Sequence, residues 1–397
     1  MLRSIVSLYY VLSLADIATS QYTTNAEAAF NQLQTWYNTS SGLWSTTGWW
    51  NSANCLTVIG DLAAIDSSVK STITGVMSNT FTQAQTYNLQ MTKVVMANYN
   101  YLSIYGNSTG ALNGIALAGN MTMQASTTVN PKGFLNNFYD DEGWWALGWI
   151  QAYDVTGNSD YLTMAEDIFA DMKNASTTPC SNGGSGIWWD RSQTYVNAIA
   201  NELYLSVSAH LANRATGSDK ANYLTIAKNQ WQWFKGTGMI NSQGTINDGL
   251  TSSCQNNGQT VWSYNQGVIL GGLVEISTAT GDSSYLSSAK SIATAAIKAL
   301  SDSNGILHDP CEPNCGGDGT QFKGVFMRNL QKLQQASPSS TYSTFIANNA
   351  KSIWANDRDS SNNGLSVNWA GPFVATANAS TQSSALDALV AAAAIGI

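Results

Sequence analysis

Three consecutive acidic residues, Asp140, Asp141 and Glu142, stand among aromatic side chains in the stretch NNFYDDEGWW, where a helix is predicted to begin. Acidic residues are favoured in a first helical turn because the exposed N–H groups and the helix dipole stabilise them. A helix cap needs only one carboxylate, however, and an apolar setting raises the cost of ionising all three. The pattern therefore favours chemistry that uses two carboxyl groups, with helix capping as the alternative.

Neighbouring carboxyl groups suit glycoside hydrolysis with retention of configuration. That reaction places two carboxyl groups about 5 Å apart, one to attack the anomeric carbon and one, kept protonated by its charged neighbour, to protonate the leaving oxygen. Consecutive Cα atoms lie about 3.8 Å apart, so Asp140 and Asp141 can flank a sugar in this way. An inverting enzyme needs a wider gap, which consecutive residues reach less easily. We predict that Asp140 and Asp141 are the catalytic residues.

Other uses of such acids fit the sequence less well. A magnesium-binding DDxxD motif would need an acid where Trp144 stands. The chain has two histidines, His210 and His308, and lacks G-x-S-x-G and phosphate-binding glycine motifs, which argues against a serine hydrolase, a histidine-based zinc site and a nucleotide site. We therefore expect no metal and no cofactor.

Tryptophan pairs are a second signal, because their rings can stack on sugar faces, although core packing is the commoner role of a single tryptophan. The pairs are Trp49 with Trp50, Trp144 with Trp145, and Trp188 with Trp189. In GGSGIWWDR the last pair ends a glycine-rich loop and runs into an acid. We predict that Trp188, Trp189 and Asp190 bind substrate.

An internal repeat positions these residues. Segments beginning at Asp140, Ala200 and Tyr264 each read as an amphipathic helix, a Thr-Gly turn and a second helix opening with Tyr-Leu. The turn glycine fits a left-handed C-cap, and the residue after it fits an N-cap. Each repeat is thus predicted to be a helical hairpin.

Counting back from the turn threonine of each repeat gives polar residues at two successive levels near the helix starts. These are Asp141, Asn201 and Asn265, followed by Glu142, Glu202 and Gln266. We predict that the side chains at these levels line one polar pocket and that sugar hydroxyls bind to Asn201, Tyr264, Asn265 and Gln266. Helix capping is the alternative for Asn265. Lys323, in FKGVFMR, opens another inner helix by the same logic and is a further candidate.

Less regular hairpins extend the pattern over the chain. They are predicted for residues 25–37 with 51–65, 69 onward, and 322–335 with 342–354, followed by a last helix over 382–394. Strand-like alternation is scarce, so the fold is expected to be all-α, either an open solenoid or a closed ring. About a dozen helices with long glycine-rich loops favour a closed (α/α)6 toroid formed by residues 21–397 as one domain. The stretch 87–132 fits either two helices or a loop at the pocket rim.

The first twenty residues are typical of a secretory signal peptide, with Arg3, a short apolar stretch and the small residues Ala-Thr-Ser. The apolar stretch is far shorter than the roughly 20 residues that span a bilayer. The net charge of −8 disfavours nucleic acid and anionic lipid. Glycosylation sequons stand at Asn38, Asn107, Asn120, Asn174 and Asn378. We expect a secreted monomer with no stable membrane insertion and no nucleic-acid partner.

Five cysteines suit an oxidising compartment. We expect Cys311 to pair with Cys315 across Glu-Pro-Asn and Cys180 to pair with Cys254, which leaves Cys55 free. A metal site at CEPNC is the alternative, but the sequence has no second cysteine or histidine pair near it.

Four motifs occur in a characteristic order over residues 25–395: FYDDEGWWALGWIQAYDVTG, GGSGIWWDR, YNQGVILGGL and FKGVFMRNL. With these motifs the chain resembles glycoside hydrolase family 76, the endo-α-1,6-mannanases. The resemblance implies an (α/α)6 fold and retaining hydrolysis of α-1,6-mannan, with Asp140 as the nucleophile and Asp141 as the acid/base. A branch of the family resembles cell-wall transglycosidases, commonly membrane-tethered, that act on anchor glycans. The last residues, SSALDALVAAAAIGI, read as a helix and form a poor anchor signal, which favours a secreted hydrolase.

Three other functions remain open at this point. A transglycosidase would transfer mannose to an acceptor sugar rather than to water. A non-catalytic glycan-binding toroid would bind mannan and leave it intact. A lyase or hexuronyl hydrolase would need basic residues at the pocket, and a total of 17 Lys and Arg argues against it.

Overall fold

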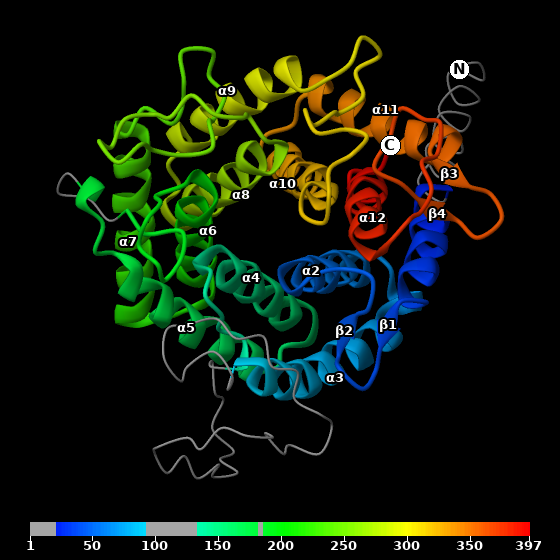
Figure 1. Cartoon of the computed structure of the whole chain (residues 1–397), viewed down its shortest axis with the longest axis horizontal. Coiled ribbons are helices and arrows are strands. Elements are labelled where there is room, and N and C mark those ends of the chain that lie inside the picture. The colour runs from blue at the N-terminus through cyan, green and yellow to red at the C-terminus, as the bar shows by residue number, and fades with distance from the viewer. Residues whose placement is uncertain (1–20, 93–132, 182–185) are drawn as a thin grey trace, which may run out of the picture.

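The helices form a closed ring of two layers (Figure 1). The computed structural model describes residues 21–92, 133–181 and 186–397. The inner layer consists of α2 (Trp49–Ile65), α4 (Tyr139–Thr156), α6 (Ala198–Arg214), α8 (Ser263–Thr280), α10 (Phe322–Ala336) and α12 (Ala379–Ala394). The outer layer consists of α3 (Ser67–Thr92), α5 (Ser159–Met172), α7 (Gly217–Gly236), α9 (Ser284–Ala299), α11 (Ser340–Asn356) and the helical residues 21–34. The predicted (α/α)6 toroid is confirmed.

Short elements complete the described part of the chain. They are the antiparallel pairs β1 (Tyr37–Asn38) with β2 (Leu43–Trp44) and β3 (Arg358–Asp359) with β4 (Gly364–Leu365), and the 3-10 turns η2 (Lys173–Ala175), η3 (Pro179–Ser181) and η4 (Gly319–Gln321). The predicted signal peptide, residues 93–132 and the sequons at Asn107 and Asn120 lie outside the described residues.

Inner helices follow one another around the ring, each in contact with the next, and α12 meets α2 to close it. The sequence predicts a hairpin of residues 25–37 with 51–65, and α2 also has a second neighbour along the chain. Helix α2 leads through Asp66 into α3, and the first helix lies beside the other end of the chain, where Gln382 of α12 donates to the Ala29 carbonyl at 3.1 Å. Ring closure needs an outer helix next to α12, and the N-terminal helix supplies it.

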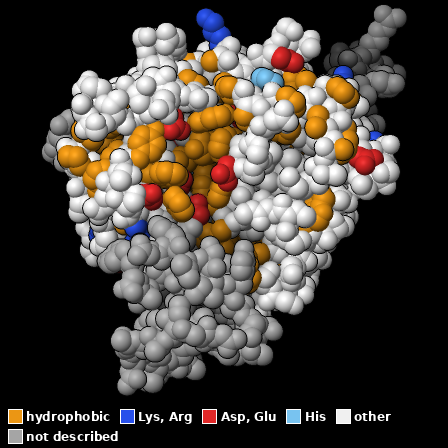
Figure 2. Space-filling model, in the orientation of Figure 1, with side chains coloured by type: hydrophobic (Ala, Val, Ile, Leu, Met, Phe, Trp, Pro, Cys, Tyr) orange, Lys and Arg blue, Asp and Glu red, His pale blue; other side chains and the backbone are white. Residues whose placement is uncertain are grey.

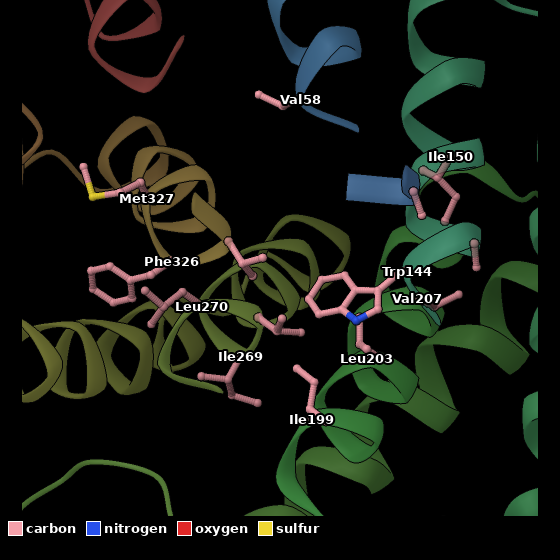
Figure 3. Close-up of a cluster of buried hydrophobic side chains, with 14 of the residues drawn as sticks. Val58, Trp144, Ile150, Ile199, Leu203, Val207, Ile269, Leu270, Phe326 and Met327 are labelled. Carbon is pink, nitrogen blue, oxygen red and sulfur yellow. The ribbon is translucent and has the colours of Figure 1, made fainter. Parts of the chain in front are cut away.

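The interior of the ring is packed with apolar side chains rather than open. Figure 3 shows such a cluster, to which five inner helices contribute. Its labelled members are Val58, Trp144, Ile150, Ile199, Leu203, Val207, Ile269, Leu270, Phe326 and Met327. Because each inner helix is buried on most sides, these helices show no single polar face, and packing rather than amphipathicity holds them.

The repeat is regular for two hairpins and shifted in the third. Helices α4 and α8 both have 18 residues and end before a left-handed glycine, Gly157 (φ 72°) and Gly281 (φ 73°). Helix α6 instead ends at Arg214, and Thr216 is the N-cap of α7, so the predicted cap at Ser218 is wrong. Asp141 of α4 and Asn265 of α8 therefore occupy equivalent positions in their helices, whereas Asn201 of α6 is shifted by one residue.

Both expected disulfides are present. Cys180 bonds to Cys254 across 74 residues, and Cys311 bonds to Cys315. Cys55 is a free buried thiol. Among the described helices, none is long and apolar enough to cross a membrane.

Candidate active site

The acidic triplet occupies the first turn of α4, with Phe138 as the N-cap residue. The Phe138 side chain makes no capping bond, and the backbone N–H groups of Asp140 and Asp141 act on the Asp140 carboxyl group instead. Asp140 and Asp141 are half-buried, whereas Glu142 is fully buried. The three acids thus divide into a pair that remains accessible and one that is enclosed.

Asp140 lies against the loop that precedes α6. Its Oδ2 accepts a hydrogen bond from the Trp189 indole Nε1 at 3.0 Å, and within the described chain its Oδ1 has no hydrogen-bond partner. Burial raises the pKa of Asp140 to about 7, against the opposing effect of Trp189 and of the backbone N–H groups at the helix start. The Trp189 indole and the backbone N–H groups therefore stabilise the ionised form of Asp140.

Asp141 accepts a hydrogen bond from the Asn136 amide at 2.5 Å. Burial raises the pKa of Asp141 well above the usual aspartate value, and the negative charge of Asp140 raises it further. Like charges this close cannot both ionise near neutral pH. The site therefore favours an ionised Asp140 beside a protonated Asp141.

Glu142 is held by Arg191. Its Oε1 lies 2.5 Å from Arg191 Nη2, which also contacts Asp171 of α5 at 2.6 Å. Burial raises the pKa of Glu142, and the Arg191 charge opposes that shift. This ion pair attaches α4 to the loop that carries Trp189.

The loop with Trp188, Trp189 and Asp190 runs alongside the start of α4. The Tyr139 N–H donates to the Trp189 carbonyl at 2.9 Å, and Phe138 and Asp190 form a β-bridge. Trp188 donates its indole N–H to Thr177 at 3.1 Å, and Asp190 accepts from the Ser192 N–H and hydroxyl. Of the three predicted binders, Trp189 reaches the aspartate pair, while Asp190 shapes the loop.

An aromatic wall continues from α4 around the ring. Trp144 stacks on Trp50 of α2 at 5.6 Å between ring centroids, and Trp50 lies 6.2 Å from Phe322 of α10. Phe322 in turn stacks on Tyr264 of α8 at 3.8 Å. Figure 2 shows a hollow at the centre of this view, with hydrophobic side chains inside it and acidic side chains around it.

The charges of several acidic residues act on Tyr264. Burial raises its pKa well above 10, and four negative charges add to the effect. In decreasing order they come from Asp248, Asp140, Glu202 and Asp318. Acids from two inner helices and two loops therefore act on one tyrosine near the aspartate pair.

Asn265 and Glu202 carry polar atoms that the protein leaves unsatisfied. Both side chains are fully buried, and neither has a hydrogen-bond partner among the described residues. Buried polar atoms without partners are costly unless a water or a ligand satisfies them. Asn265 thus keeps its predicted capacity to bind a hydroxyl.

Two of the predicted binders, Asn201 and Gln266, bond to neighbouring loops through their amides. Asn201 exchanges hydrogen bonds with the Ile187 N–H and carbonyl, and Gln266 does the same with Ile246. Both amides are fully buried. Their polarity serves the backbone of the loops that precede α6 and α8, not the pocket.

Lys323 is likewise buried away from the pocket. Its ammonium lies 2.8 Å from Glu312 and donates to the carbonyls of Val367 and Leu307. These contacts use its three donors, so none remains for a sugar. Lys323 anchors the disulfide loop that contains Glu312.

Sequence reasoning missed several residues of this region. Arg191 and Asn136 contact the acidic turn, and Asp248 accepts a hydrogen bond from the Tyr195 hydroxyl at 2.6 Å. Arg191 follows the WWD stretch directly, and a basic residue beside that motif is the signal that could have pointed to a partner for the buried Glu142. Asp248 and Asp318 lie in loops outside the repeat, so no periodicity marks them.

An (α/α)6 ring with two adjacent, partly accessible carboxyl groups at the start of an inner helix suits a glycoside hydrolase. The family comparison agrees, since the model of glycosyl hydrolase family 76 matches residues 15–395. The chain belongs to this family, as the motifs indicated.

Curated relatives are fungal proteins. One, from Schizosaccharomyces pombe, is provisionally named a mannan endo-1,6-alpha-mannosidase and is 30% identical over 254 residues, or 56% of each chain. The mannan endo-1,6-alpha-mannosidase DCW1 of Candida albicans is 29% identical over 48% of this chain and 46% of its own. The chain thus spans about half the length of the curated relatives it matches.

Solved structures share the fold. An alpha-1,6-mannanase of Salegentibacter, described as inactive with two adjacent aspartates changed to asparagine and bound to alpha-1,6-mannotriose, has a TM-score of 0.70 at 19% identity. The match covers 94% of this chain and 99% of that one. Dfg5 of Chaetomium thermophilum, in complex with glucosamine, has a TM-score of 0.72 at 16% identity and covers 95% and 91%.

Proposed function

We propose that the protein is a retaining endo-α-1,6-mannosidase that hydrolyses mannan backbones. One observation carries this proposal: two adjacent aspartates at the start of α4 have unequal surroundings, with donors around Asp140 and the charge of Asp140 beside Asp141. The names of the fungal relatives support the substrate. The inactive double variant of the bacterial mannanase supports a catalytic role for such a pair.

In this mechanism Asp140 attacks the anomeric carbon as its bond to the leaving oxygen breaks, and the Asp141 proton moves to that oxygen. The glycosyl–Asp140 ester then reacts with water. Asp141, now a carboxylate, takes one proton from the water, and the water oxygen displaces Asp140. Two inversions at the same carbon give retention.

The test is the separate replacement Asp140→Asn and Asp141→Asn. Each should lower the rate of linear α-1,6-mannan hydrolysis by a factor of about 10³ or more, because neither attack nor proton donation survives the change. Asp219→Asn is a matched control, since Asp219 is an exposed acid in the first turn of the outer helix α7. Near-normal activity of both pair variants would contradict the proposal and favour a glycan-binding ring.

The products distinguish the finer alternatives. NMR of the freshly released reducing ends reports whether the α-anomer is retained, and the product lengths report endo action. Running the reaction in oxygen-18 water with an added acceptor separates hydrolysis from transfer. The glucosamine bound to Dfg5 makes an amino sugar a suitable acceptor. If mannose is transferred to the acceptor and the products contain no oxygen-18, the protein is a transglycosidase rather than a hydrolase.

We also propose that the protein is secreted with glycans on exposed sequons. Asn38 and Asn174 are exposed, whereas the Asn378 side-chain oxygen caps α12 by accepting from the Ser380 and Thr381 N–H groups. The two disulfides suit an oxidising compartment. N-terminal sequencing and glycopeptide mapping of the exported protein test this proposal.

A further inference from the structure

Asp318 stands on the loop that leads into α10 and has no part in the mechanism so far. The loop is tightened by the Cys311–Cys315 disulfide, and the Gly319 N–H donates to the Cys315 carbonyl at 3.2 Å. Asp318 itself is exposed and is followed by η4 and then by Phe322 of the aromatic wall. The disulfide and this hydrogen bond thus constrain the backbone on both sides of Asp318.

Trp50 holds the Asp318 side chain. The indole Nε1 of Trp50 donates to Asp318 Oδ1 at 2.8 Å. The same ring stacks on Trp144, one turn beyond the aspartate pair on α4. The indole therefore bridges the carboxylate of this loop to the helix that carries Asp140 and Asp141.

The charges around the pair are acidic. Asp318 raises the pKa of Asp140, Asp141 and Tyr264 through its negative charge. Of the other acids nearby, Glu142 is paired with Arg191. Glu202 and Asp248 raise the pKa of Tyr264 through their negative charges.

We propose that Asp318 is a positioning residue of the active site: Trp50 holds its negative charge near the aspartate pair, where that charge sets the pH range in which the pair carries the single proton that a retaining mechanism requires. The inference rests on the proposed function. Repulsion between Asp140 and Asp141 already keeps one proton on the pair, and a third negative charge moves the pH range of the singly protonated pair to higher pH.

The first test is the pH profile of kcat/KM for Asp318→Asn. Removing one negative charge lowers the pKa values of the pair, so both limbs of the profile should move to lower pH, by about half a unit for a solvent-exposed charge. The displacement should shrink in 1 M salt, because Asp318 is exposed and salt screens it. Asp318→Glu keeps the charge and should largely restore the profile.

Asp282→Asn is the matched control. Asp282 is an exposed acid in the turn after α8, at the other end of the helix from Tyr264. It caps the Ser284 N–H through Oδ1, a bond that asparagine can also make. This variant loses the same charge and should leave the profile unchanged.

A second measurement needs no substrate. Infrared or carbon-13 NMR titration of the carboxyl groups in Asp318→Asn should show the pair losing its proton at lower pH than in the parent protein. A folded variant with unchanged carboxyl titration would overturn the inference, even if its activity were lost, because Asp318 would then act on substrate. Failure of the proposed mannosidase function would be seen in a different experiment, because mannan hydrolysis would then survive in the Asp140 and Asp141 variants.

Discussion

Asp140 and Asp141 are neighbours in one helical turn, and their surroundings make them different acids. Trp189 and the backbone N–H groups favour the carboxylate of Asp140, whereas Asp141 faces that carboxylate. Asn136 gives Asp141 one donor, which offsets part of the effect. A nucleophile and an acid therefore arise from two identical residues.

The raised pKa of Asp140 has a direct consequence for activity. Below about pH 7 the pair takes up a second proton and attack by Asp140 fails. Hence kcat/KM for α-1,6-mannan should fall as pH decreases through 7, rather than near pH 4 as for an ordinary aspartate. A pH–rate profile of the free enzyme checks this, and full activity down to about pH 4 contradicts it.

Arg191 is the cation on which the buried Glu142 depends. Arg191→Gln leaves a fully buried acid without its partner and should lower the free energy of unfolding by about 3 kcal/mol. Adding Glu142→Gln should recover part of that loss, because a neutral amide needs no cation. Chemical denaturation of the two single variants and the double variant measures the coupling. Arg358→Gln is the control, since Arg358 bonds to the Trp354 carbonyl and the Asn363 amide oxygen.

At the scale of elements, glycines set how closely the inner helices approach. A Cβ on Gly267 of α8 would lie 2.6 Å from the Cα of Phe326 in α10. A Cβ on Gly324 of α10 would lie 2.5 Å from the Cα of Ser384 in α12. Because the obstacles are backbone atoms, only separation of the helices could relieve them.

Two glycine-to-alanine variants should therefore change stability in opposite directions. Gly267→Ala should cost about 2 kcal/mol or more through forced separation of α8 and α10. Gly75→Ala should stabilise by about 1 kcal/mol, because Gly75 is exposed within α3 and its new Cβ meets nothing within 4 Å. Urea denaturation of both variants tests this, and equal effects would contradict the close packing of α8 on α10.

For the whole molecule, loops between hairpins build the face that holds the site, and a disulfide fixes two of them. Cys180 follows α5 and Cys254 precedes α8, so their bond ties together the loops on either side of the α6–α7 hairpin. Trp233 of α7 reinforces this region by donating its indole N–H to the Cys180 carbonyl at 2.8 Å. The loop that carries Trp189 begins after Cys180 and leads into α6.

Loss of the Cys180–Cys254 bond should destabilise the ring as a whole. Replacing both cysteines by serine releases a 74-residue loop in the unfolded state and should lower the free energy of unfolding by about 3 kcal/mol. Cys55→Ala, which removes a buried sulfur but no cross-link, is the control. Denaturation curves with and without reductant measure both, and an unchanged midpoint for the double variant would contradict the expected role.

The sequence alone determined the features that depend on neighbouring residues. Helical periodicity, the turn glycines Gly157 and Gly281, the adjacency of Asp140 and Asp141 and both cysteine pairings could be predicted. The repeat also predicted the ring. Local spacing carries this information because caps, turns and carboxyl adjacency are set within a few residues.

Tertiary structure decided which polar side chains face the pocket. Asn201, Gln266 and Lys323 have the right positions on their helices, but the loops that pass beside them take up their hydrogen bonds. Asp318 reaches the site from a loop outside the repeat. The physical reason is that the direction of a buried amide, the partner of a buried charge and the pKa of a carboxyl depend on groups distant in sequence, which meet only when the ring closes.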